Sequence, residues 1–301
     1  VLFYTAAGNP TVQGLAYSTD GRNFTKYEGN PTLKQITPGN RDPKVIWHEP
    51  TQRWVMVLYV EVEGVHTMQF FTSTNLKEWT FTSQTDHFFE CPDFFELPVD
   101  GDESNKKWVL IGASSEYRIG SFDGKAFTPE SPMIPGHRGK GISAAQAFSD
   151  VPDGRRILMG WWQTETKGMA FNQSMSLPLE LKLTKTGAGP RMTFAPVKEL
   201  ENLRAKEHRI PSFTLKPGDK NPLGEIQADL SEIRVSFEPG DANEIAFNIR
   251  GATVTYDARK QEVEVNGHRA PAPLRDGKQS LTIYSDRIGL EVFSDEGLCF
   301  V

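Results

Sequence analysis

Residues 16–25 of the chain read AYSTDGRNFT, and this stretch decides the fold because two further stretches repeat its pattern. Residues 71–80 read FTSTNLKEWT, and residues 120–128 read GSFDGKAFT. Each stretch has the pattern of a strand, a polar turn and an aromatic residue, and the aromatic residues lie 55 and 48 positions apart. These aromatic residues are Phe24, Trp79 and Phe127. A unit of roughly 50 residues with about four strands is typical of one blade of a β-propeller.

A second pattern lies between these turns and supports the same unit. An apolar strand with a polar start is followed by another strand that begins with a basic residue. The three pairs of segments are 42–47 with 53–56, 91–97 with 107–110, and 145–148 with 156–159. The visible units therefore predict about three complete blades and part of another. A β-sandwich whose hairpins are similar by chance is the alternative that these patterns leave open.

The remaining sequence indicates a second domain that is also built from strands. Almost no segment has the 3.6-residue apolar period of a helix, and the one good helix candidate is residues 197–205, with Leu200 and Leu203 on one side. From about residue 206, short segments alternate polar and apolar residues, with turn signals spaced by about 8–12 residues, as in a sandwich. We therefore predict an all-β chain with a propeller over residues 1–205 and a β-sandwich over residues 206–301.

Composition narrows the kinds of partner. The 301 residues carry 33 Lys and Arg against 39 Asp and Glu, which gives a net charge of −6. Nucleic acids and anionic membranes need a basic face, so we predict neither as a partner. No apolar run approaches the roughly 20 residues of a membrane span. The slightly acidic net charge fits an uncharged ligand such as a sugar. The six histidines do not have the spacing of metal ligands, and we therefore predict no metal and no cofactor.

Two carboxylates occupy equivalent positions in the repeat. Asp42 and Glu90 are 48 residues apart, and a proline follows each within two residues. The innermost strand of each blade lines the central channel of a propeller, so we expect the two side chains to converge on one axial funnel. Paired carboxylates in a concave site for a neutral substrate are the groups that hydrolyse glycosidic bonds. An aspartate before a proline is, by itself, more often a turn residue.

Five segments, in this order, resemble motifs of glycoside hydrolase family 32, the invertase, levanase and inulinase family. They are NRDPKV at 40–45, FECPD at 89–93, AAQAFSD at 144–150, RILMGW at 156–161 and MSLPLEL at 175–181. Residues 283–293 are also similar to the C-terminal module of the family. The resemblance covers nearly the whole chain. It implies a five-bladed β-propeller followed by a β-sandwich, which agrees with the pattern of strands.

The resemblance also implies an activity and assigns roles to residues. Members of the family hydrolyse or transfer β-linked fructosyl units with retention of configuration, so we expect fructan or sucrose as the substrate. Glu90 would be the general acid and base, and Asp42 would stabilise the transition state. Arg41 and Cys91 would bind the substrate beside them. Trp161 is a candidate sugar-stacking residue, although tryptophan also packs commonly between blades.

One motif of the family has no counterpart in this sequence. The family's nucleophile is an Asp in a Trp-x-Asn-Asp-Pro-Asn-Gly motif of the first blade. The chain also begins at Val1–Tyr4 and ends at Leu298–Val301, and both segments have the composition of strands. We therefore expect both ends to be cut, with the first blade and part of the second missing. Retention requires a nucleophile, so we expect the chain alone to be inactive.

Three functions remain open at this point. The first is a retaining hydrolase of levan, inulin or sucrose, of which this chain is a portion. The second is an inactive fragment or a glycan-binding module that lacks the nucleophile. The third is a related five-bladed hydrolase of arabinosyl or xylosyl linkages, which the motifs around Asp42 and Glu90 favour less. The family resemblance further implies a secreted or periplasmic protein.

Overall fold

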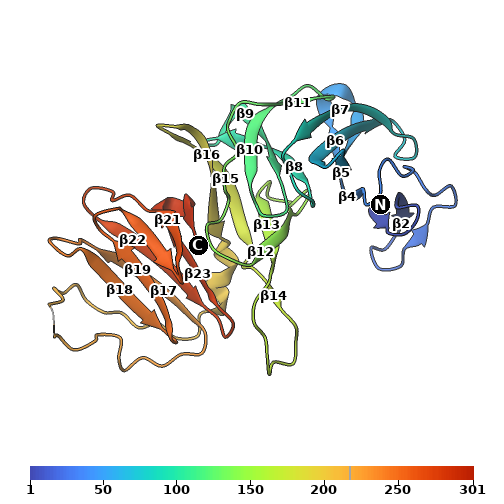
Figure 1. Cartoon of the computed structure of the whole chain (residues 1–301). Helices are drawn as coiled ribbons and strands as arrows, with labels where there is room; N and C mark the ends of the chain where they lie inside the picture. The colour runs from blue at the N-terminus through green and yellow to red at the C-terminus, as the bar shows by residue number, and fades with distance from the viewer. Residues whose placement is uncertain (217) are drawn as a thin grey trace.

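The computed structural model describes residues 1–216 and 218–301, and its regular structure is almost entirely β. Figure 1 shows two parts: an arc of small sheets from the blue N-terminus to the yellow residues, and an orange to red pair of sheets at the C-terminus. The described residues contain three short 3₁₀ helices, η1 (Glu49–Thr51), η2 (Lys198–Leu203) and η3 (Asp295–Gly297). Within these residues no helix is long and apolar enough to span a membrane.

The first two blades are separate antiparallel sheets. A three-stranded blade consists of β1 (Leu2–Ala6), β2 (Val12–Tyr17) and β3 (Thr25–Lys26). A four-stranded blade follows, with β4 (Arg41–His48), β5 (Arg53–Val62), β6 (Val65–Ser73) and β7 (Thr80–Asp86) in sequence order. Each strand pairs with the next along the chain, as in a propeller blade.

The third and fourth blades share hydrogen bonds at one point. The third blade is β8 (Asp93–Val99), β9 (Asp102–Ile111), β10 (Tyr117–Phe122) and β11 (Phe127–Pro129). The fourth blade is β12 (Ile142–Ala147), β13 (Arg156–Trp162), β14 (Ser174–Met175), β15 (Leu179–Thr186) and β16 (Gly189–Pro196). A single parallel pair, Leu183 with Val99, joins the two blades into one nine-stranded sheet.

The sequence repeat corresponds to a repeated turn. Asp20, Asn75 and Asp123 each precede the outermost strand of a blade. In each case Oδ1 accepts hydrogen bonds from the backbone N–H groups two and three residues further on, at 2.8–3.0 Å. Asp and Asn favour this geometry because their short side chains reach their own backbone. The propeller predicted from the repeat is therefore confirmed at the level of its turns.

Adjacent blades pack face to face through apolar side chains. One cluster joins the second blade to the third, through residues such as Val57, Phe70, Phe94 and Leu110. A second cluster joins the third blade, the fourth blade and the C-terminal domain. Burying these faces stabilises the arc, because each blade alone would expose an apolar sheet surface.

The C-terminal domain is the predicted β-sandwich. One antiparallel sheet contains β17 (Ser231–Phe237), β22 (Gln279–Ser285), β23 (Leu290–Ser294) and β24 (Cys299–Phe300). The other contains β18 (Glu244–Ile249), β19 (Ala252–Asp257), β20 (Glu262–Val265) and β21 (His268–Pro271). Alternate residues of both sheets form one apolar core, in which Val254, Tyr256, Val263, Ile283 and Val292 are fully buried.

The helix predicted at residues 197–205 is wrong in type and length. The structure has the 3₁₀ helix η2 at Lys198–Leu203, which buries no residue. Leu203 is 77% exposed, so this segment has no apolar face to pack, and no side chain caps its first turn. The segment that follows, residues 204–230, contains no strand among its described residues. We retain residues 1–205 and 206–301 as the proposed division into domains.

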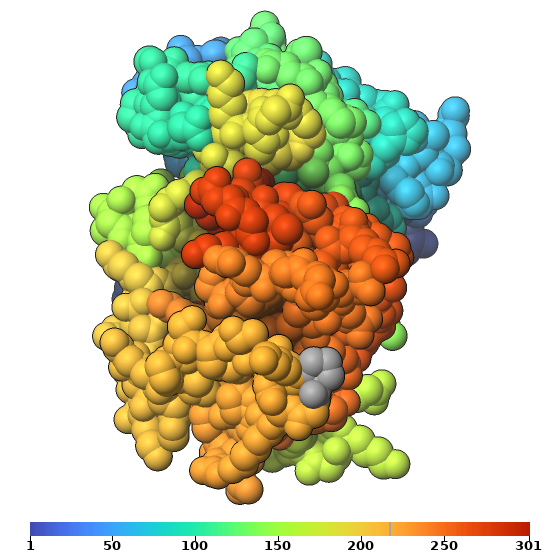
Figure 2. All heavy atoms as spheres, turned by 90° about the vertical axis from the view of Figure 1, so that its left-hand side faces the viewer, coloured from blue at the N-terminus to red at the C-terminus, as the bar shows by residue number. Residues whose placement is uncertain are grey.

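The sandwich lies directly against the fourth blade. The rings of Phe293 and Phe300 stack at 4.7 Å, and Phe300 also contacts Phe194 of β16 at 5.8 Å. The backbone N–H of Leu177 donates to both carboxyl oxygens of Glu291 at 3.2 Å. Figure 2 shows the red C-terminal residues against the yellow residues of the fourth blade. The interface is therefore apolar, with a few polar contacts.

Candidate active site

The first strands of successive blades come together at the centre of the arc. β4 contacts both β1 and β8, and β8 contacts β12. Inner strands that meet in this way bring the starts of β4 and β8 to the same place. Asp42 lies at the start of β4, and Glu90 lies three residues before β8. The convergence that the repeat predicted is therefore present in the structure.

The backbone is unusual where these inner strands begin. Asp42, Glu90, Cys91 and Ala144 have φ of 63°, 45°, 44° and 51°. The pairing register shifts between Arg41 and Lys44 of β4, and a similar shift occurs in β12. A non-glycine residue in this region costs about 1–3 kcal/mol and persists only where its surroundings enforce it. Bulges of this kind re-aim side chains, and in β4 the bulge contains Asp42.

The two carboxylates, a thiol and a guanidinium form one compact cluster. One carboxylate oxygen of Asp42, one of Glu90 and Sγ of Cys91 all lie within 4.8 Å of one another. Arg41 Nη2 donates to Glu90 Oε1, and Arg41 Nε lies 3.9 Å from Asp42 Oδ2. The side chains of Arg41, Asp42 and Glu90 are 33%, 31% and 29% exposed, so a ligand can reach all three. The charges are therefore partly balanced within the cluster.

Cys91 supports Asp42 from the neighbouring blade. The backbone N–H of Cys91 donates to Asp42 Oδ2 at 3.1 Å, and its thiol lies 3.5 Å from the same oxygen. Burial, together with the negative charge of Asp42, raises the pKa of the Cys91 thiol to about 12. The thiol is therefore neutral at physiological pH and acts as a hydrogen-bond donor to Asp42.

The guanidinium of Arg41 makes a cation–π contact with Tyr59. Its guanidinium carbon lies 4.6 Å from the ring centroid of Tyr59, its partner across the strand pair. The Tyr59 hydroxyl is 2.6 Å from His66 Nδ1, and both rings contact Phe89, the residue before Glu90. Burial opposes the charge on Arg41, but the hydrogen bond and charge of Glu90 outweigh it and raise the pKa of Arg41. Arg41 is thus held as a cation against Glu90.

The first blade contributes to the backbone of Asp42. The N–H of Asp42 donates to Thr5 Oγ1 at 3.0 Å, and the Thr5 hydroxyl donates to Gln13 Oε1 at 2.8 Å. Gln13 is fully buried, and its amide donates to the carbonyl of Asn40 at 3.0 Å. These bonds hold the unusual backbone of Asp42 in place.

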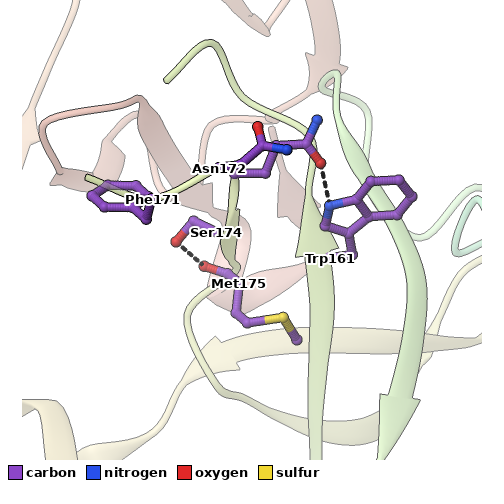
Figure 3. A pocket seen from close by; sticks show the side chains of 6 residues that line it. Trp161, Phe171, Asn172, Ser174 and Met175 are labelled. Atoms are coloured by element: carbon purple, nitrogen blue, oxygen red, sulfur yellow. Dashed lines mark hydrogen bonds between the residues drawn. The ribbon is translucent and has the colours of Figure 1, made fainter. Parts of the chain in front are cut away.

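Trp161 lines a hollow that does not include the carboxylate cluster. Figure 3 shows it beside the segment that includes β14, where Trp161 Nε1 donates to Gln173 Oε1 at 2.5 Å. The hollow has a volume of about 590 Å³ and is lined by Trp161 and residues 171–175. Trp161 is 42% exposed, but neither Asp42 nor Glu90 lines this hollow. The structure thus brings Arg41, Asp42, Glu90 and Cys91 together, and it leaves the sugar-stacking role of Trp161 a prediction.

Several residues at the site had no distinct signal in the sequence. Tyr59 and His66 lie on strands whose pattern indicates only an apolar core, and Thr5 and Gln13 lie in an unremarkable N-terminal hairpin. Their positions depend on which strands become neighbours. A pairing register for β4 and β5 would have revealed Tyr59 opposite Arg41, but a single sequence does not provide that register.

The cluster has the composition of a site for an uncharged, hydroxyl-rich ligand. Carboxylates accept hydrogen bonds from hydroxyl groups, and Arg41 donates them. On distance alone Asp42, Glu90 and Cys91 could hold a metal ion, but the Arg41 guanidinium already lies against both carboxylates and would repel a cation. Acid–base chemistry by the carboxylates therefore fits the site better than metal chemistry.

Family models match both parts of the chain. Residues 1–196 match the glycosyl hydrolases family 32 N-terminal domain, and residues 199–301 match the glycosyl hydrolases family 32 C-terminal model. A levanase of Bacillus subtilis is 36% identical over 95% of this chain, and a levanase of a second Bacillus strain is 32% identical over 96%. These alignments cover 49% and 37% of the two levanases, so the chain spans half or less of their length.

Solved structures show a similar fold. The exo-inulinase of Aspergillus awamori superposes with a TM-score of 0.82 at 24% identity, over 99% of this chain and 72% of that chain. A fructofuranosidase variant of Schwanniomyces occidentalis in complex with fructosylnystose has a TM-score of 0.79 at 20% identity, over 99% and 70%. At these identities the similarity concerns the fold, which is a propeller followed by a sandwich.

Proposed function

Because the chain belongs to glycosyl hydrolase family 32, we propose that its propeller carries the acid–base part of an active site for β-linked fructosyl units. The observation that supports this most directly is the convergence of Asp42 and Glu90 within 4.8 Å, with Arg41 against both. Two carboxylates that face a common, partly exposed space are the groups that glycoside hydrolysis uses.

In this proposal each residue has one role. Glu90 protonates the leaving glycosidic oxygen and later activates a water molecule. Asp42 accepts hydrogen bonds from fructosyl hydroxyls and stabilises the positive charge of the transition state. Arg41 donates to fructosyl hydroxyls, and the contact between Arg41 and Glu90 breaks when Glu90 turns to the substrate. Cys91 keeps Asp42 oriented through its N–H and its thiol.

The names of the relatives support a proposal for the substrate and the location. Two relatives that align with most of this chain are named levanase, and another, at 25% identity, is named extracellular exo-inulinase. We therefore propose a fructan or sucrose as the substrate and an extracytoplasmic location. Trp161 is the proposed second contact with a fructan chain, because its indole is exposed and fixed by Gln173.

A second candidate is binding without cleavage by the 301 residues alone. Retaining hydrolysis needs a nucleophile besides the acid and the stabiliser. Among the described residues, the cluster within 4.8 Å contains the carboxylates of Asp42 and Glu90, to which the proposal gives the other two roles. The sequence has no Trp-x-Asn-Asp-Pro-Asn-Gly motif to supply the nucleophile. We therefore expect this chain by itself to bind fructosyl units and to hydrolyse them very slowly.

One experiment tests both candidates. The purified chain is titrated with a fructo-oligosaccharide in a calorimeter, and fructose release from levan, inulin and sucrose is measured in parallel. We expect saturable binding that Arg41→Ala and Asp42→Asn weaken by about tenfold or more, the effect of losing a charged hydrogen bond. Azide is then added with an aryl β-fructoside, so that an external nucleophile can attack the anomeric carbon while the aryloxide leaves.

The outcomes separate the candidates clearly. Aryloxide release that requires azide and Asp42 supports an active site without its nucleophile. Rapid release of fructose without azide would refute the argument about the nucleophile and would support a complete hydrolase. Absence of any fructoside binding, or equal binding by an arabinosyl or xylosyl oligosaccharide, would refute the proposed substrate.

A further inference from the structure

A buried ion pair lies within three residues of the site carboxylates in sequence. Lys44 Nζ is 2.8 Å from Asp93 Oδ1, and the two side chains are 10% and 0% exposed. Lys44 follows Asp42 by two residues on β4, and Asp93 follows Glu90 by three residues at the start of β8. The ion pair therefore joins β4, which carries Asp42, to the first residue of β8, which follows Glu90, but it is too deeply buried to contact a substrate.

Ala147, on the inner strand of a further blade, contacts both members of this ion pair, and the three residues together are called the junction here. The N–H of Ala147, in β12, donates to Asp93 Oδ2 at 2.6 Å. The carbonyl of the same residue accepts from Lys44 Nζ at 3.2 Å. Phe94 N–H donates to Asp93 Oδ1 at 3.0 Å. One peptide position of β12 thus contacts both charged groups, and three successive blades meet through them.

The position of the site depends on how these blades are held together. β4 and β8 do not hydrogen-bond to each other as strands, because they belong to different sheets. The contact of Cys91 with Asp42 Oδ2 joins β4 to the segment before β8, and the ion pair joins β4 to the first residue of β8. The positive φ values of Asp42, Glu90 and Cys91 are states that only a firmly held surrounding structure maintains.

We propose that Lys44 and Asp93 are positioning residues, whose junction with Ala147 sets the distance and orientation between the carboxylates of Asp42 and Glu90. A packing role alone would be served as well by apolar residues, because burying two charges offsets much of their attraction. An ion pair differs from apolar contacts in its defined direction and length. The geometry of the junction is independent of the proposed function, and only its effect on turnover rests on that function.

The test uses Cys91 as a reporter of the site. The chain has two free cysteines, and Cys299 is only 1% exposed, so a Cys299→Ser background leaves Cys91 as the single thiol. In the parent, burial and Asp42 keep the thiol protonated at pH 8, and alkylation by iodoacetamide is slow. Asp93→Asn and Lys44→Met should each accelerate alkylation by about tenfold, as a locally opened segment would.

A matched control separates positioning from general destabilisation. Val292→Ala creates a cavity in the sandwich core, far from the site in the fold, and lowers stability without touching the junction. Alkylation rates are compared at urea concentrations that give equal unfolding free energy. Asp93→Glu serves as a conservative variant, because it retains the charge and changes only the length of the side chain. It should also accelerate alkylation.

Kinetics provide the second readout. In the azide-dependent reaction, each junction variant should lower kcat by about 10²-fold, the effect of misplacing a catalytic group by roughly 1 Å, and should raise KM by less than the roughly tenfold expected of Asp42→Asn. Alkylation rates equal to those of Val292→Ala at equal stability would refute the positioning role, whether or not the parent turns over. A parent that shows no turnover even with azide would refute the acid–base role proposed for Glu90 and leave binding without cleavage, because the alkylation result stands by itself.

Discussion

Arg41 connects the chemistry of the site to its architecture. It contacts both carboxylates from the bulge in β4, and its guanidinium lies on the ring of Tyr59. Arg41 donates to Glu90 in the structure, and in the proposed function a substrate hydroxyl replaces Glu90 as the acceptor. At the scale of single residues, the site is therefore a set of competing hydrogen bonds around one cation.

The role proposed for Glu90 leads to a prediction that depends on the leaving group. In the azide-dependent reaction, Glu90→Gln should slow release of a poor leaving group such as phenoxide by about 10²–10⁴-fold, the usual contribution of general acid catalysis. From a 2,4-dinitrophenyl fructoside, the dinitrophenoxide leaves without protonation, so Glu90→Gln should reduce the rate with this substrate far less. The measurement is kcat/KM for the two aryl β-fructosides.

The control for this prediction is the neighbouring carboxylate. Asp42→Asn should slow both aryl fructosides to a similar extent, because a transition-state stabiliser acts whatever the leaving group. An equal loss for both substrates in Glu90→Gln would contradict the assignment of Glu90 as the acid.

At the scale of elements, the same turn recurs before the outermost strand in three of the blades. Its side-chain acceptor is an aspartate in two blades and Asn75 in the other, with the same pair of backbone donors. In two of the blades the chain also uses Ser18 or Ser73 to accept a hydrogen bond from the backbone three residues on. The turn directs the chain back along the blade edge.

Asn75 therefore gives a prediction for the second blade. Asn75→Ala removes the acceptor for the N–H groups of Lys77 and Glu78 and should lower the free energy of unfolding by about 1 kcal/mol, as in the loss of a helix cap. Asn75→Asp should retain stability within about 0.5 kcal/mol, because aspartate serves in the equivalent turns. Urea unfolding checks both, and a destabilised Asn75→Asp would show that the turns are not equivalent.

At the scale of the whole molecule, the interface between propeller and sandwich contains a buried carboxyl. Glu291 is 4% exposed, and its oxygens accept only from the N–H of Leu177 among the described hydrogen bonds. Burial, with a smaller contribution from the charge of Asp286, raises the pKa of Glu291 to about 8, although the Leu177 N–H opposes this. Glu291 is therefore largely protonated in the folded protein at pH 7.

This raised pKa predicts how stability depends on pH. Between the ordinary value of 4.5 and about 8, the folded protein retains a proton on Glu291 that the unfolded chain has lost. Stability should therefore fall as pH rises through this window, by about 1.4 kcal/mol per unit at most. Glu291→Gln mimics the protonated form and should reduce the difference between unfolding free energies at pH 5 and pH 8.

The matched control is an exposed glutamate. Glu225 pairs with Lys220 on the surface, with side-chain exposures of 83% and 81%, and Glu225→Gln should leave the pH dependence of the parent unchanged. Urea unfolding at the two pH values is the measurement. If Glu291→Gln retains the full pH dependence of the parent, the interface carboxyl is not its source.

The sequence by itself determined the local units of this protein. Turn residues, alternating strands and the spacing of Phe24, Trp79 and Phe127 identify blades and a sandwich, because hydrogen bonds within a turn and the two-residue period of a strand involve residues that are close along the chain. The equivalence of Asp42 and Glu90 within the repeat likewise placed both at the centre of the arc. The helix expected at 197–205 failed for the complementary reason: its apolar spacing was read without knowing that Leu203 has no surface to pack against.

Only the tertiary structure decided what surrounds those carboxylates. Tyr59 beneath Arg41, the thiol of Cys91 against Asp42, and the junction of Lys44, Asp93 and Ala147 each join residues from strands whose neighbours a single sequence does not specify. The separate hollow of Trp161 is of the same kind. The physical reason is that blade-to-blade packing is set by shape and burial over many side chains, and a change of one residue in register would move every one of these groups to another face.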